Sequence, residues 1–200
     1  MNIFKQTALA LVLTFSSMGA FAGVNGLVGY GSDYIFRGVS QTDGGAFAHA
    51  GAHYDHGSGI YVGAWLGQVD YADGSDLETD LYVGWANDHI DVMYIDYSYN
   101  GDADLDGSEL MIGSEFMGVS LDYYLGQDDY SDYMELGYTL KGVDVSYGMW
   151  EDIGDNIAIS KSFDLPMGIE GSVGFTKFMA EDGSLLQDED SFVFGVMKTF

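Results

Sequence analysis

The chain has 200 residues, no cysteine and a single proline, and its 32 acidic residues far outnumber its six lysines and arginines. The formal net charge of −26 at pH 7 disfavours nucleic acid as a partner, because phosphate binding requires clustered basic side chains. Without cysteine, neither a disulfide framework nor thiolate chemistry is available. The charge instead favours cations, or surfaces that carry bridging cations, as partners.

The first 22 residues are predicted to be a secretory signal peptide. Lys5 supplies a positive charge, residues 7–15 form an apolar run, and Ala20-Phe21-Ala22 is a small-x-small cleavage site. The apolar run is shorter than the ~20 residues that a membrane-spanning helix needs. We therefore predict two parts: a signal peptide over residues 1–22 and a single domain over residues 23–200.

The rest of the chain alternates apolar and polar residues in short segments, which predicts twelve strands and no helix. The predicted strands span residues 24–37, 46–55, 60–68, 77–86, 90–99, 109–116, 119–126, 132–140, 143–150, 156–163, 168–178 and 190–200. Short connections alternate with longer ones, and the longer ones hold most of the loop carboxylates. Short periplasmic turns and longer external loops are typical of outer-membrane barrels.

The predicted fold class is all-β: a transmembrane antiparallel up-and-down β-barrel of about 12 strands, with longer acidic external loops. One row of each strand is apolar and free of mid-strand charge, as a lipid-facing row must be. These rows include Tyr34 and Phe36 in the first strand and Met93, Ile95, Tyr97 and Tyr99 in the fifth. The alternative is a soluble barrel with the apolar rows inside, and the signal peptide and the loop asymmetry favour the membrane barrel.

The opposite rows are predicted to line a lumen. Their charged and aromatic members are Asp33, Arg37, His49, His53, Tyr61, Trp65, Glu78, Asp80, Asp96, Glu115, Asp122, Glu135, Asp144 and Glu170. Rings of carboxylates favour cation passage. Twelve strands give a bore between that of small, side-chain-filled barrels and that of porins with 16 to 18 strands. The prediction is a narrow, cation-preferring passive diffusion channel.

Arg37 is the only arginine, and Asp33 lies four residues before it on the same predicted face. This spacing predicts an ion pair on the lumen wall. The pair could help to gate the channel mouth, or it could anchor a loop, which is the commoner role of buried pairs.

His49 and His53 share the inward face of the second predicted strand. They could bind a metal or act with a serine such as Ser58 in lipid hydrolysis. However, they lie about 13 Å apart along a strand, and no nucleophile elbow accompanies them. We therefore predict no catalytic residue and no enzymatic activity.

Asp102, Asp104 and Asp106, followed by Gly107, resemble the start of an EF-hand loop. Gly113 stands where the bidentate glutamate is expected. The pattern predicts at most weak Ca²⁺ binding at an external loop, and no other cofactor.

Residues 34–42, with the sequence YIFRGVSQT, and residues 54–65, with the sequence YDHGSGIYVGAW, carry a family resemblance. The chain resembles the TorF-type porin family of Gram-negative bacteria. This implies a barrel of the bacterial outer membrane that is proposed to act as a porin, with no established binding residues to carry over. The last strand, which ends at Phe200, also resembles the signal for the barrel-assembly machinery, although Lys198 departs from it.

Outer-membrane lipid, lipopolysaccharide and small cations or small solutes are the expected partners. Two alternatives to a channel stay open. One is a non-conducting surface protein whose acidic loops bind divalent cations, and the less favoured one is a lipid-modifying barrel enzyme.

Overall fold

The computed structural model describes residues 23–72, 74–101, 105–127 and 130–200. These residues form a closed antiparallel barrel of twelve strands, in which each strand pairs with its neighbours in the chain and the last pairs with the first. The strands are β1 (Gly23–Gly31), β4 (Phe47–Asp55), β5 (Ile60–Gln68), β6 (Leu77–Ala86), β7 (Asp91–Tyr99), β8 (Gly107–Phe116), β9 (Val119–Gly126), β10 (Tyr133–Leu140), β11 (Val143–Trp150), β12 (Gly154–Leu165), β13 (Ile169–Ala180) and β14 (Glu189–Thr199). The predicted closed barrel is confirmed, and eleven of its predicted strands agree with these bounds within two residues.

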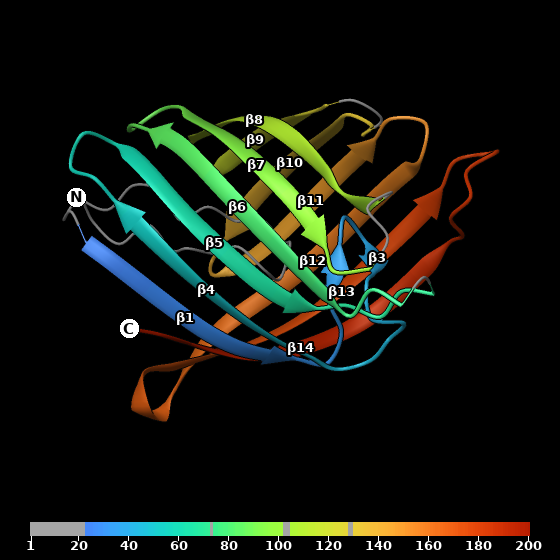
Figure 1. Ribbon diagram of the computed structural model, residues 1–200, viewed down its shortest axis with the longest axis horizontal. Helices are drawn as coiled ribbons and strands as arrows, with labels where there is room; N and C mark the ends of the chain where they lie inside the picture. The colour runs from blue at the N-terminus through green and yellow to red at the C-terminus, as the bar shows by residue number, and fades with distance from the viewer. Residues whose placement is uncertain (1–22, 73, 102–104, 128–129) are drawn as a thin grey trace.

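The first predicted strand is wrong in its second half. β1 ends at Gly31, and the chain then forms a small separate hairpin from β2 (Ile35–Phe36) and β3 (Val39–Ser40). Gly31 is paired directly with Phe47 at the start of β4, so residues 32–46 leave the wall and return to the same point. Figure 1 shows this hairpin inside the barrel outline, at the end opposite to the start of β1.

The two ends of the barrel differ as predicted. β1 begins and β14 ends at the same end, where the strand connections are short (Figure 1). Two of these turns, Met117-Gly118 and Lys141-Gly142, have positive φ at both residues, as the type I′ turns of two-residue hairpins require. The longer loops lie at the other end, together with the β2–β3 hairpin. In the part of the chain described here, no helix is long and apolar enough to cross a membrane.

The outer face of the barrel is apolar. Its exposed side chains include Val28, Tyr30, Val62, Leu66, Leu81, Val83, Ile112, Leu121, Leu136, Val145, Ile157, Ile159, Val173, Phe194 and Val196. Outward aromatic residues gather toward both strand ends, with Tyr54, Trp85 and Phe116 near the short turns. This arrangement is the one that a lipid-facing surface with aromatic girdles would require.

Strand β7 faces the opposite way from the prediction. Tyr97 is the direct partner of Asp80, and Asp96 is the direct partner of Leu81, which is exposed on the outer face. Because direct cross-strand partners share a face, Tyr97 points inward and Asp96 points outward. The predicted lumen position of Asp96 is therefore wrong, as is the predicted lipid-facing row of Met93, Ile95, Tyr97 and Tyr99.

The apolar row of β7 points inward because part of the barrel interior is packed with side chains. One buried cluster consists of Tyr34, Phe47, Trp65 and Val69, and a second consists of Tyr61, Tyr82, Ile95 and Tyr97. Both clusters contain residues of the wall, and the first contains Tyr34 from the excursion that holds the hairpin. An inward row can therefore be as apolar as an outward one.

Candidate functional site: a hairpin across the barrel interior

The base of the β2–β3 hairpin is organised around Asp33. This carboxylate is buried and accepts hydrogen bonds from the Ser40 hydroxyl at 2.7 Å and the Thr42 hydroxyl at 2.9 Å. The backbone closes the same base, because the Gln41 amide donates to the Tyr34 carbonyl at 2.7 Å. Asp33 therefore holds the two arms of the excursion together. The predicted Asp33–Arg37 ion pair is wrong.

Arg37 lies at the tip of the hairpin, in a left-handed conformation with φ of 49°. Its Nη1 and Nη2 donate to Glu109 Oε1 and Oε2 of β8 at 2.8 and 2.6 Å. Both partners are buried, with Arg37 6% and Glu109 0% exposed. Burial lowers the pKa of Arg37, but the attraction and hydrogen bonds of Glu109, together with the nearby Tyr97 and Tyr133, raise the pKa above its ordinary value, so the guanidinium keeps its charge. A bidentate charged pair thus joins the hairpin to the wall.

Aromatic rings surround the same guanidinium. The ring centroids of Tyr133, Phe36, Tyr124 and Trp150 lie 4.2, 4.6, 5.0 and 5.3 Å from Arg37 Cζ. They come from β10, the hairpin itself, β9 and β11. Attraction between a cation and aromatic faces is worth about 2 kcal/mol or more when the group is desolvated, as it is here. Arg37 is therefore held in the interior by an aromatic cage rather than on the lumen wall.

The hairpin contacts the wall on opposite sides of the barrel. Tyr34 stacks on Phe47 of β4 with ring centroids 5.2 Å apart, and it lies 5.4 Å from Trp65 of β5. Two strands from β4 in the barrel order, the Ser40 amide donates to Glu189 Oε1 of β14 at 3.2 Å, whereas the strands opposite β4 are those that Arg37 contacts. Together with the contacts of Arg37 to β8, β9, β10 and β11, these bonds carry residues 33–42 across the interior.

Gly38 is wedged between the hairpin tip and the wall, and this predicts a sharp effect of a single methyl group. Its φ is +89°, and an added Cβ would lie 2.7 Å from Asn156 Cβ and 3.2 Å from Phe178 Cβ. We expect Gly38→Ala to lower the free energy of unfolding by about 2–4 kcal/mol, from the backbone strain and the overpacking together.

Gly44→Ala is the matched control, because Gly44 also has positive φ (+72°) but faces open space. We expect it to cost only about 1 kcal/mol from the backbone. Urea unfolding of the two variants in the same detergent measures the difference. Equal losses would mean that the hairpin tip does not press against β12 and β13.

The register places most of the predicted lumen residues on the inner face. They are His49, His53, Tyr61, Trp65, Glu78, Asp80, Glu115, Asp122, Glu135, Asp144 and Glu170. Asp122 and Glu135 are direct partners on β9 and β10, and Asp144 accepts a hydrogen bond from Thr139 at 2.8 Å. Whether these side chains line an open passage stays a prediction.

The sequence family is clear from one match. The family model Gcw_chp, described as a bacterial protein of unknown function, matches residues 19–200. The chain belongs to the Gcw_chp family. This match does not confirm the predicted TorF-type resemblance. A search of curated proteins finds no relative of this Gcw_chp chain.

Solved structures similar to this Gcw_chp chain include variants of the porin of Rhodopseudomonas blastica. Two of these variants have 17% and 16% sequence identity and TM-scores of 0.42 and 0.41. A third structure, described as "Asymmetric conductivity of engineered proteins", has 17% identity and a TM-score of 0.43. Each match covers 77% of this chain and 55% of the other, so the Gcw_chp chain spans about half the length of these proteins.

His49 and His53, which were predicted to face the lumen from one strand, contact different residues in the Gcw_chp barrel. His49 stacks on Phe47 at 5.3 Å and accepts a hydrogen bond from Trp65 Nε1 at 3.3 Å. His53 lies 3.1 Å from the Tyr82 hydroxyl and 3.0 Å from Asp55 Oδ1. The Ser58 hydroxyl lies instead 2.8 Å from His56 Nδ1, in an exposed short turn. The histidine–serine pairs considered from the sequence are therefore not brought together.

The sequence predicted at most weak Ca²⁺ binding, by Asp102, Asp104 and Asp106 between β7 and β8. Asp102 and Asp104 lie outside the described residues. Asp106 accepts a hydrogen bond from the Tyr99 amide at 2.8 Å, which ties the loop to the end of β7. Within the described ranges, no group of three or more His, Cys, Asp or Glu side chains is arranged to hold a metal ion.

The residues that hold the hairpin tip were not predicted from the sequence. Glu109 shares the inward face of β8 with Glu115, so alternation along this strand was enough to place it inside. Tyr97, whose hydroxyl donates to Glu109 Oε2 at 2.9 Å, was assigned to lipid. The partnership of Arg37 with Glu109 had no sequence signal, because the barrel joins strands that are far apart in the chain.

Proposed function

We propose that this protein is an outer-membrane channel whose passage is controlled by the β2–β3 hairpin. The outward apolar side chains would face lipid, and the closed barrel leaves no unpaired strand edge in the membrane. Residues 1–22 would be removed as a signal peptide, and residues 23–200 would span the membrane. The substrates would be small cations or small solutes.

The observation that carries this proposal is the polar attachment of the hairpin. Gly31 and Phe47 are paired directly, so the wall closes without residues 32–46. The hairpin is held largely by an ion pair, hydroxyl–carboxylate bonds and a caged cation. Replacing a buried ion pair by apolar residues is often neutral or stabilising, so such pairs are weak evidence for a purely structural role. Polar contacts of this kind can instead exchange their partners for water when the hairpin moves.

Cation preference follows from the charges that face inward. Asp122, Glu135 and Asp144 lie on the inner face of β9–β11, between the hairpin and the short-turn end. Lys141, Lys161 and Lys177 are exposed, and Arg37 is already paired with Glu109. Carboxylates that outnumber fixed cations favour cation passage.

We expect a KCl gradient across planar bilayers to give a cation-selective reversal potential. Asp122→Asn combined with Asp144→Asn should reduce that selectivity, because both substitutions remove inward negative charge. Asp182→Asn, at an exposed loop acid between β13 and β14, is the control and should leave it unchanged. Anion selectivity of the unmodified protein would refute the cation preference.

The packed interior also fits the second candidate function, a non-conducting surface protein that binds divalent cations through its external loops. The two candidates differ in one measurement. A channel conducts at least when the hairpin is removed, whereas the surface protein conducts neither with nor without it.

A further inference from the structure

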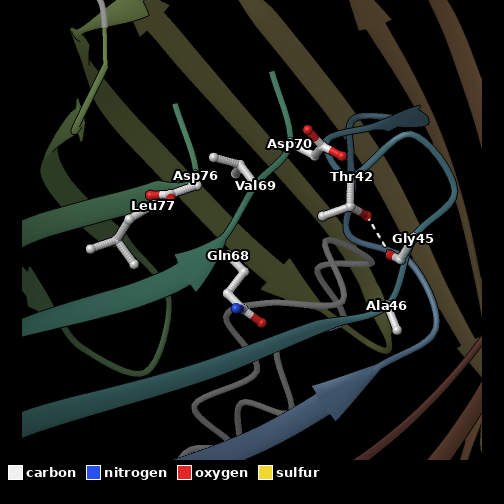
Figure 2. A pocket seen from close by; sticks show the side chains of 8 residues that line it. All are labelled: Thr42, Gly45, Ala46, Gln68, Val69, Asp70, Asp76 and Leu77. Carbon is white, nitrogen blue, oxygen red and sulfur yellow. Dashed lines mark hydrogen bonds between the residues drawn. The ribbon is translucent and has the colours of Figure 1, made fainter. Parts of the chain in front are cut away.

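A pocket of about 460 Å³ lies at the long-loop end of the barrel, beside the base of the hairpin. Its lining includes Thr42 and Ala46 from the returning arm of the excursion, Gln68 at the end of β5, and Val69, Asp70 and Asp76 from the β5–β6 connection. Figure 2 shows these side chains around the gap between the two chain segments. The volume lies in the range of sites for small molecules, about 300–1,000 Å³.

The pocket exists because two neighbouring strands separate near their ends. The β4–β5 ladder ends with the pair of His49 and Gly67, and beyond it Gln68 Oε1 accepts a hydrogen bond from the Ala48 amide at 2.9 Å. The walls are tied together above this point, since the Asp70 amide donates to the Gln41 carbonyl at 2.9 Å. The pocket is therefore a fixed opening between connected segments.

The chemistry of the lining selects one class of ligand. Asp70 and Asp76 provide carboxylates, and Ala46, Val69 and Leu77 provide apolar surface. Asp76 Oδ1 accepts from Asn100 Nδ2 at 2.6 Å. No lysine or arginine occurs between Arg37 and Lys141, so this part of the chain offers no basic side chain to neutralise the two carboxylates.

We propose that this pocket binds a small organic cation, namely a protonated primary amine with a short apolar body. The ammonium group lies at the carboxylates, and the hydrocarbon part covers Ala46, Val69 and Leu77. Asp33 and the pocket both contact Thr42, so an occupied pocket steadies the base of the hairpin. This last consequence rests on the proposed channel function, whereas binding does not.

Isothermal titration of the folded protein in detergent with n-butylammonium chloride tests the site. We expect saturable binding that n-butanol and sodium butyrate do not reproduce at matched ionic strength. Asp70→Asn combined with Asp76→Asn should weaken it at least tenfold, and Ala46→Trp should do the same by filling the pocket with its charges intact. Asp182→Asn and Ala52→Trp, at exposed positions away from the pocket, are the matched controls and should bind as the unmodified protein does.

Three results would overturn the site: no binding of n-butylammonium, binding unaffected by Ala46→Trp, or equal affinity for n-butylammonium and Ca²⁺. Equal affinity would mean that the acidic loops attract any cation and that the pocket does not select an organic one. Because no conductance is measured, failure of the site and failure of the channel are separate results. Heat-modifiable gel migration verifies that each variant is folded.

Discussion

Replacing residues 32–46 by a short Gly-Ser turn is expected to raise the single-channel conductance several-fold. Gly31 and Phe47 are already direct partners, so a tight turn joins β1 to β4 and keeps every pair of the twelve-strand ladder, although the two bonds of Ser32 to Phe194 are lost. The replacement removes Arg37, Phe36 and Tyr34 from the interior, where they contact strands on both sides. The unmodified protein should show small or brief openings in planar bilayers, and the variant a continuous larger conductance.

The control for this experiment shortens a different external loop. Residues 181–188 connect β13 to β14, and they are largely exposed. Their removal should leave the conductance unchanged. If the protein without the hairpin is folded and conducts no better than the unmodified one, the hairpin is not the barrier, and zero conductance in both would favour the non-conducting surface protein.

Arg37→Ala is expected to lower the free energy of unfolding by about 3–5 kcal/mol, because it leaves Glu109 buried without its cation. The cage of Phe36, Tyr124, Tyr133 and Trp150 also loses the group that it surrounds. The double variant Arg37→Met with Glu109→Leu should recover most of the loss, because it removes both charges together. Recovery of stability in the double variant is the sign of a true pair.

Urea unfolding in a single detergent or lipid measures the free energy of unfolding of Arg37→Ala, of the double variant and of a control. Lys177→Met is the control, because Lys177 is an exposed cation opposite Asp190 on the outer face, and it should change stability by at most about 1 kcal/mol. A loss below 1 kcal/mol for Arg37→Ala, or no recovery in the double variant, would contradict the view that the ion pair latches the hairpin.

The wall of the barrel was predictable because strand alternation and turn chemistry are local properties. Segments such as residues 60–68, 77–86, 119–126 and 143–150 were predicted at their observed bounds. Alternation tells which residues share a face, but it does not tell which face is outside. In β7 the inward row is Met93, Ile95, Tyr97 and Tyr99, because it packs against other interior aromatics, so apolar character alone gave the wrong orientation.

The hairpin was not predictable for a related reason. Alternation continues from Tyr30 through Arg37, although the chain leaves the wall after Gly31. The sequence did contain one indication of a buried ion pair, which was the lone Arg37 in a strongly acidic chain. Asp33 was predicted as its partner because Asp33 is close to Arg37 in the sequence. The actual partner, Glu109, is brought into reach only by closure of the barrel.

The hairpin also bears on how the first and last strands are joined. β1 and β14 pair from Leu27 and Thr199 to Gly31 and Gly195. Beyond that ladder, the Ser32 amide donates to the Phe194 carbonyl at 2.9 Å, and the Phe194 amide donates to Ser32 Oγ at 3.0 Å. With the bond from Ser40 to Glu189, the arm that leads into the hairpin clasps the final strand of the chain. Those bonds require β14 to be in place beside β1, so the hairpin makes its full set of contacts only in a closed barrel. A fully bonded hairpin therefore reports that β1 and β14 are paired and that the barrel is closed.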